Sequence, residues 1–192
     1  MHTANDNSNT TTLLRSEPTE VQRTIAIALD DSKLAQVTFD HAMENIVRPD
    51  DLVVLIHVQS NDASVILSGL HPLHDKAVAD ARRESAHVLL KHHAARLSEA
   101  KIAFTALYLI GPIKEALVQK VNNLRVSTLV VGAGGVDSKR PAFLGSVADY
   151  CIHYCECPVL VVKPTAEQIK ELHLAPVHPP LFDAPTVLRM PM

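Results

Sequence analysis

The chain has 192 residues, a hydrophobic content of 47% and a formal net charge of −3 at pH 7. This length and composition predict one domain with a sizeable core. No basic block and no tryptophan are present, which argues against nucleic acid as a partner, and no apolar run is long enough to span a membrane.

Residues 1–22 are rich in Asn, Thr and Ser and contain little to bury, so we predict a disordered N-terminal arm. The first residues lack the charged start and apolar segment of a secretory signal. We therefore expect a cytoplasmic protein.

From residue 23 onward, short β-branched apolar runs alternate with helical patterns, each bounded by turn or capping residues. The predicted order is strand 24–29, helix 32–47, strand 52–58, helix 75–101, strand 104–110, helix 111–124, strand 129–131, helix 146–154 and strand 159–162. Ser32 and Ser146 are the predicted N-caps of their helices. Such alternation predicts an α/β fold, a parallel sheet with helices on both faces.

Residues 165–192 are predicted to form a C-terminal tail. It begins with a short helix at 165–174 and is proline-rich beyond it. Leu181 and Phe182 would allow the tail to cover an apolar surface. A flexible end is the alternative.

Four of the six glycines in the chain lie within fourteen residues: Gly132, Gly134, Gly135 and Gly145. They follow a predicted buried strand and precede the helix that begins near Ser146. A glycine loop that leads into a helix N-terminus directs backbone N–H groups and a positive dipole end to one place. That arrangement suits an anion, typically phosphate.

The spacing Gly132-x2-Gly135-x9-Gly145-Ser146 resembles the G-2x-G-9x-G-(S/T) signature of the ATP-binding branch of the universal stress protein family. The run Cys157–Val162 is similar to the closing strand of that family. The resemblance covers roughly residues 23–164, a nucleotide-binding domain. It implies a single open, five-stranded parallel sheet of Rossmann-like type, with strand order 3-2-1-4-5.

Asp30 follows the first predicted strand. Ligands of open α/β sheets bind beyond the carboxyl ends of the strands, where the strand order reverses. In the implied order this point lies between the first and fourth strands, so Asp30 and the glycine loop would face one crevice. Asp30 could then accept hydrogen bonds from ribose hydroxyls; the alternative is that it only caps the next helix.

The resemblance implies the remaining ligand positions for ATP, with Mg²⁺ possible as its counter-ion. The backbone of Val58 would meet the adenine edge, Gly132 would lie by the ribose, and Gly135, Gly145, Ser146 and Val147 by the phosphates. The full set of expected nucleotide-binding residues is Ala28, Asp30, Val58, Gly132, Gly135, Gly145, Ser146 and Val147. Asp31 departs from the glycine common at its position in the family and adds negative charge. Lys139 and Arg140 could add positive charge or remain solvated.

Other nucleotide chemistry finds little support. No glycine precedes Lys-Ser or Lys-Thr, so a Walker loop is absent, and no general base or arginine finger can be assigned. We expect a nucleotide-dependent stress-response or signalling module with at most slow ATP hydrolysis. The alternatives are a nucleotide-free dimer of the same fold and a nucleotidyl-transfer enzyme, whose His-x-Gly-His signature is missing.

The cysteines and histidines have other interpretations. Cys151, Cys155 and Cys157 lie within seven residues, and we interpret them as small buried hydrophobes rather than disulfide or metal ligands. His87 and His92 are five apart, about 140° around a helix, which is poor ligand geometry. We expect surface or half-buried histidines and no metal site.

The last predicted strand, Val159–Val162, ends the sheet, so four apolar residues would lie on an edge. Two copies could pair these edges about a two-fold axis. The resemblance implies a homodimer through this strand. The competing possibility is that the tail covers the edge and keeps the chain monomeric.

Overall fold

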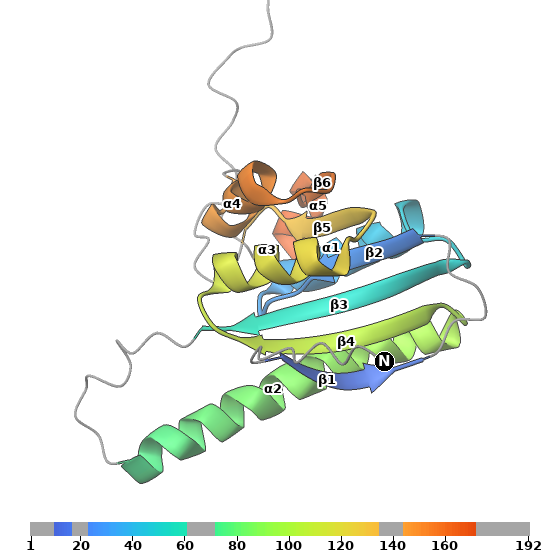
Figure 1. Ribbon diagram of the computed structural model, residues 1–192. Helices are drawn as coiled ribbons and strands as arrows, with labels where there is room; N and C mark the ends of the chain where they lie inside the picture. The colour runs from blue at the N-terminus through green and yellow to red at the C-terminus, as the bar shows by residue number, and fades with distance from the viewer. Residues whose placement is uncertain (1–9, 17–22, 61–71, 135–143, 172–192) are drawn as a thin grey trace, which may run out of the picture.

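Six strands form one mixed sheet in the order β1-β4-β3-β2-β5-β6 (Figure 1). The computed structural model describes residues 10–16, 23–60, 72–134 and 144–171, with the backbone alone over 72–78. The strands are β1 (Thr10–Arg15), β2 (Arg23–Ala28), β3 (Asp51–Gln59), β4 (Ala103–Ile110), β5 (Thr128–Gly132) and β6 (Val159–Val162). The helices are α1 (Lys33–Asn45), α2 (Pro72–Glu99), α3 (Ile113–Leu124), α4 (Ser146–Tyr154) and α5 (Ala166–Glu171).

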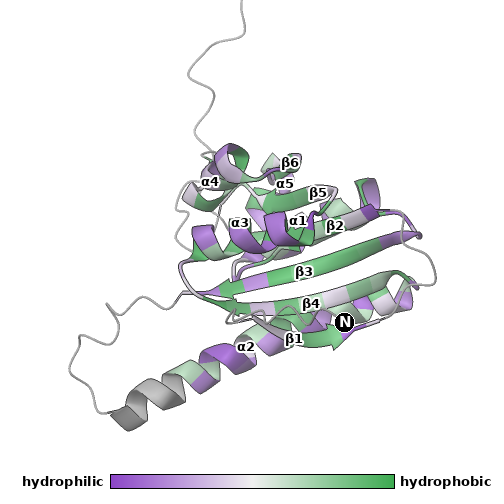
Figure 2. Ribbon diagram, in the orientation of Figure 1, coloured by the Kyte–Doolittle hydropathy of each residue, from purple (hydrophilic) through white to green (hydrophobic). Residues whose placement is uncertain are grey.

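The five strands β4-β3-β2-β5-β6 are all parallel, which confirms the predicted α/β fold and the order 3-2-1-4-5. Their apolar runs are continuous rather than alternating because helices cover both faces of the sheet. Figure 2 shows β3 and β4 mainly in the hydrophobic colours, whereas the helices carry hydrophilic residues on their outer sides.

The sixth strand corrects the sequence analysis. Residues 10–15 of the supposedly disordered arm form β1, which pairs antiparallel with β4, from Thr10 opposite Leu109 to Arg15 opposite Thr105. The register shifts between Thr12 and Leu14. The leucines of β1 pack against the core, and the free edge of β4 supplies backbone partners that the polar composition did not reveal. The rest of the predicted arm lies outside the described residues.

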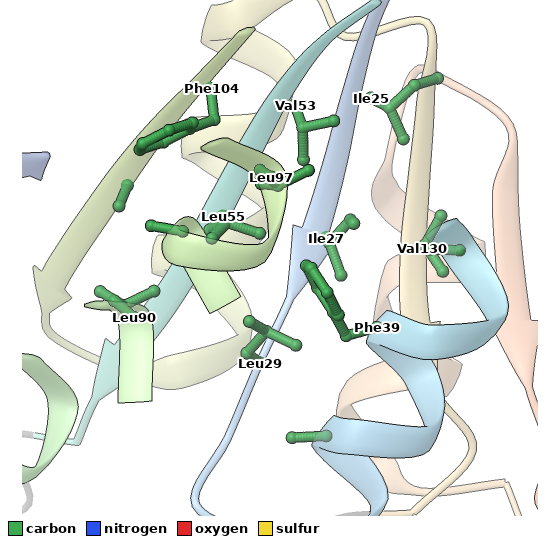
Figure 3. Packing of buried hydrophobic residues seen from close by; sticks show 14 of the residues in the cluster. Ile25, Ile27, Leu29, Phe39, Val53, Leu55, Leu90, Leu97, Phe104 and Val130 are labelled. Atoms are coloured by element: carbon green, nitrogen blue, oxygen red, sulfur yellow. The ribbon is translucent and has the colours of Figure 1, made fainter. Parts of the chain in front are cut away.

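Helices α1 and α2 cover one face of the sheet. Figure 3 shows Phe39 of α1 beside Ile27 of β2, and Leu97 of α2 over β3 near Leu55. Arg96 of α2 forms an ion pair with Asp40 of α1, and its guanidinium lies 5.0 Å from the centre of the Phe39 ring. These contacts fix α2 to α1 as well as to the sheet.

Helices α3 and α4 cover the opposite face, in front of the sheet in Figure 1. Leu117 and Val121 of α3 and Ala148 and Cys151 of α4 pack against residues such as Ile56 of β3. The sheet therefore separates two hydrophobic cores, and its carboxyl edge opens between the helix N-termini.

Arg23, at the start of β2, ties three elements together. Its Nε and one Nη donate to the two carboxylate oxygens of Asp51 (2.8 and 2.7 Å), at the start of β3. The same side chain donates to the carbonyl of Ile46, which follows α1 (3.2 Å). Asp51 also accepts the backbone N–H of Arg48 (2.7 Å). The Asp51 carboxylate is completely buried, and its hydrogen bonds with the Arg23 side chain raise the pKa of Arg23.

The short helix α5 begins as the sequence predicted. The Thr165 hydroxyl accepts the N–H of Gln168 (3.2 Å), and the Gln168 side chain accepts the N–H of Thr165 (2.9 Å). This reciprocal pair is a capping box. The proposed covering segment with Leu181 and Phe182 lies outside the described residues. No helix in the described part of the chain combines the length and apolar character needed to cross a bilayer.

Candidate functional site

A cleft of about 970 Å³ lies at the carboxyl ends of β2, β3 and β5, between the N-termini of α1, α3 and α4. It is lined by seven of the eight predicted nucleotide-binding residues: Ala28, Asp30, Val58, Gly132, Gly145, Ser146 and Val147. The eighth, Gly135, lies outside the described residues, as do Lys139 and Arg140. The volume is at the upper end of the range typical of ligand pockets. Residues far apart in sequence thus meet at the place that the strand order predicts.

Asp30 is half-buried at the turn between β2 and α1. One carboxylate oxygen, Oδ1, accepts the hydroxyl and the backbone N–H of Ser32 (2.5 and 3.1 Å). The other oxygen, Oδ2, makes no hydrogen bond within the described part of the chain. Both interpretations of Asp30 thus have a structural basis, because one oxygen shapes the turn and the other is available to a ligand.

Ser32 occupies the N-cap position of α1, but its side chain makes no capping bond to the helix. Its hydroxyl donates to the carboxylate of Asp30. The predicted capping bond is therefore wrong, although the helix begins where expected.

Gly132 ends β5, directly beneath α1. A Cβ atom at this position would lie 2.9 Å from the hydroxyl oxygen of Thr38, which is buried and itself donates to the carbonyl of Leu34 (2.9 Å). Glycine is needed here because α1 approaches the backbone of β5 too closely for a side chain. Thr38 also lines the cleft, and the sequence analysis did not identify it.

The N-terminus of α4 forms another wall of the cleft. Gly145, not Ser146, is the N-cap, so the predicted cap is displaced by one residue. The N–H of Gly145 donates to the Ala133 carbonyl (2.5 Å), and the first helical bond runs from Asp149 back to Gly145. The intervening N–H groups of the first turn border the cleft and have no helical acceptor, as at any helix start. They present a positive dipole end to the cleft.

Gly145 also has a structural role. A Cβ atom here would lie 3.1 Å from the Ala133 carbonyl oxygen and 3.4 Å from the Cα of Gly134. Its φ of −68° is ordinary for any residue, so the constraint is close packing of the loop rather than an unusual backbone conformation. A valine here would disturb the loop as well as any ligand.

The α3 side of the cleft was not predicted. Pro112, Ile113, Lys114 and Glu115 line it, at the turn after β4. The signal was the Gly-Pro turn after a predicted strand, because the carboxyl ends of neighbouring parallel strands meet at one edge of the sheet. In the described part of the cleft, the acidic residues are Asp30, Asp31 and Glu115, and the only lysine or arginine is Lys114.

Outside the cleft, the three cysteines are free, with Cys151 buried and the others half-buried. Burial raises the pKa of Cys151 to about 12 and that of Cys155 to about 11. Thiols that remain protonated at neutral pH pack as small hydrophobes, which supports that interpretation. Among the described residues, no group of three His, Cys, Asp or Glu side chains could hold a metal ion.

Sequence comparison relates residues 22–163 to known proteins through a model of the universal stress protein family, which matches this segment. A relative from Arabidopsis thaliana, universal stress protein PHOS32, is 29% identical over 159 residues. The match covers 74% of this chain and 65% of that protein, so the chain spans just under two thirds of the relative.

Solved structures share the fold. A universal stress protein family member from Arabidopsis thaliana with AMP bound superposes with a TM-score of 0.57 and 22% identity, over 76% of this chain and 94% of its own. A universal stress protein in complex with cAMP gives a TM-score of 0.55 and 17% identity, over 74% and 98%. At these identities the likeness shows the fold alone.

Proposed function

Because the chain belongs to the universal stress protein family, we propose that it binds ATP in this cleft and acts as a nucleotide-dependent stress-response module. The observation that carries the proposal is the convergence of seven predicted nucleotide-binding residues on one cleft beside the N-terminus of α4. A strand-end cleft bordered by a helix N-terminus suits a phosphorylated ligand. Membership of the universal stress protein family supports a ligand of this kind.

The ligand would lie across the strand ends. Its phosphates would meet the first-turn N–H groups of α4 at Ser146 and Val147. Its ribose would lie near Gly132 and donate a hydroxyl to the available Oδ2 of Asp30. Its adenine would meet the backbone of Val58, on β3.

Related structures hold AMP and cAMP, so the identity of the nucleotide is a matter for direct measurement. The acidic lining of the described cleft favours a ligand whose charge is partly neutralised. We therefore propose that ATP binds with Mg²⁺ as its counter-ion and AMP with little dependence on the metal. Any ATP hydrolysis would be slow, because we assign no residue as a general base.

The proposal is tested by calorimetric titration of the full chain with ATP, with and without Mg²⁺, and with AMP and cAMP. We expect ATP with Mg²⁺ to bind most tightly. Absence of binding by all three nucleotides would contradict the proposal and favour a nucleotide-free module.

Asp30 offers a sharper variant. Asp30→Asn keeps an oxygen for Ser32 but replaces the acceptor that faces the ligand, so it should weaken ATP by about 1–3 kcal/mol, the usual cost of a charged acceptor. It should weaken 2′-deoxy-ATP less. The control is Ser32→Ala, which removes the hydroxyl bond to Asp30 and leaves the carboxylate with its bond from the Ser32 backbone N–H. Equal losses in the two variants would assign Asp30 to the turn alone.

We further propose a cytoplasmic homodimer joined through β6. The support is that β6 lies at the edge of the sheet and carries Val159, Leu160 and Val161 only half-buried. A dimer that needs no nucleotide remains the second candidate function, since this edge is independent of the cleft.

A further inference from the structure

His57 is a buried histidine at the carboxyl end of β3, beside the cleft. Its Nδ1 lies 3.0 Å from the carbonyl oxygen of Leu29. A carbonyl can only accept, so Nδ1 carries the proton and donates. The imidazole stacks on Tyr108 of β4, with the ring planes 7° apart and their centres 6.1 Å apart. The ring is thus fixed by both neighbouring strands.

The hydrogen bond from His57 to the Leu29 carbonyl occupies the position where the next hydrogen bond between β2 and β3 would form. The pairing of β2 with β3 ends at Ala28 opposite Ile56, and the N–H of Leu29 still donates to the Ile56 carbonyl (2.9 Å). The N–H and C=O of a strand residue point to the same side, and the side alternates along the strand. Val58, two residues after Ile56, therefore turns its own N–H toward β2, where the Leu29 carbonyl is the next acceptor in register.

The Leu29 carbonyl instead accepts the Nδ1–H of the His57 imidazole. The N–H of Val58 makes no hydrogen bond to Leu29, nor to any other group beyond the strand ladders in the described part of the chain. A half-buried N–H without a protein partner is normally satisfied by water or a ligand. Val58 lines the cleft, so a ligand there can reach its N–H and C=O together.

We infer that His57 is a positioning residue, which occupies the Leu29 carbonyl and so keeps the Val58 N–H available to the base of the ligand. The inference rests on the proposed function. Adenine presents an acceptor, N1, beside a donor, its 6-amino group, and a strand residue presents an N–H and a C=O on one side. Guanine presents the reverse pattern at these positions, so the free N–H also selects the base.

The test compares AMP with 1-deaza-AMP, which lacks the N1 acceptor, by calorimetry. The wild-type chain should prefer AMP by about fivefold to tenfold, the usual effect of one hydrogen bond. In His57→Leu the freed Leu29 carbonyl can pair with the Val58 N–H, so the preference should fall to about one. In His57→Asn the side-chain amide can still donate to Leu29, and the preference should be restored. A preference that survives in His57→Leu, or none in the wild type, overturns the inference.

A second measurement needs no ligand and separates this inference from the proposed function. The Val58 amide should exchange rapidly with solvent deuterium in the free wild-type chain, measured by NMR, and become protected in His57→Leu. Equal protection in both chains overturns the inference even if nucleotides bind. Failure of AMP to bind while exchange behaves as expected contradicts only the proposed function. His41→Leu, at an exposed histidine of α1, is the control for loss of an imidazole elsewhere.

Discussion

Asp51 is a buried acidic residue outside the cleft. Its buried carboxylate accepts two bonds from Arg23 and one from the N–H of Arg48. Asp51→Ala would leave the guanidinium and this N–H without their acceptor, so we expect the free energy of unfolding to fall by about 3 kcal/mol. Urea denaturation measures the change. Asp50→Ala, at the exposed neighbouring residue, should change stability by less than about 0.5 kcal/mol. A similar effect of both variants would show that the buried bonds contribute little.

For single residues, the sequence predicted well which of them line the cleft. It predicted less well which contacts each of them makes. Asp30 and Gly132 could be placed at strand ends because a buried run stops before each. Spacing could not reveal that Thr38 would exclude a side chain from Gly132, since that contact is made between two separate elements. Nor could it reveal that the Ser32 hydroxyl would donate to Asp30 without accepting a first-turn N–H of α1, because the carboxylate and those N–H groups lie equally near Ser32 in sequence.

At the scale of the helices and strands, α2 packs against α1 through a buried histidine whose protonation at low pH is unfavourable. His93 is buried against Phe39, with ring centres 4.5 Å apart, and its Nδ1 has no hydrogen-bond partner. Its pKa is lowered from 6.5 to about 4, mainly by burial and also by the neighbouring His92 and Arg96, while Asp40 of α1 acts in the opposite direction. His93 and His57 are both buried, which contradicts the expectation that the histidines are exposed or half-buried.

The pH dependence follows from the sign of that shift. The unfolded chain binds the proton first, so stability is lost as the pH falls from about 6.5 toward 4. Between pH 7 and pH 5 we expect His93 to account for about 2 kcal/mol of the loss. His93→Leu should lack this component in thermal or urea unfolding, whereas His41→Gln, at an exposed histidine of α1, should keep it. Parallel pH profiles for the wild type and His93→Leu would contradict this assignment.

The order of the helices and strands could be predicted wherever an element has an apolar pattern of its own. The five parallel strands and their helices follow from apolar runs and capping residues. The strand β1 was not predictable in the same way, because a Thr-rich segment has no apolar pattern of its own and depends on the edge of β4 for its hydrogen bonds. Long-range pairing of this kind is determined by the partner.

For the whole molecule, the proposed dimer depends on β6. Val161 is half-buried on a strand whose outer side has no neighbour among the described residues. Val161→Lys would place a charge on the paired edge, so light scattering should show a monomer where the wild-type chain is a dimer. Val88→Lys, at an exposed residue of α2, is the matched control and should remain dimeric. A monomeric wild type that dimerises when the chain is cut after Lys163 would instead support a covering tail.

The N-terminal strand has a consequence for how far such assembly can proceed. A sheet with two receptive edges can add copies at both and grow into a fibre. Here β1 covers the eight-residue apolar edge of β4 and replaces it with a shorter, threonine-rich border, interrupted by a register shift and ending at Arg15. Short, irregular and charged edges resist further strand addition. Polymerisation would thereby be blocked at one end, so the proposed contact through β6 would close on itself at two copies.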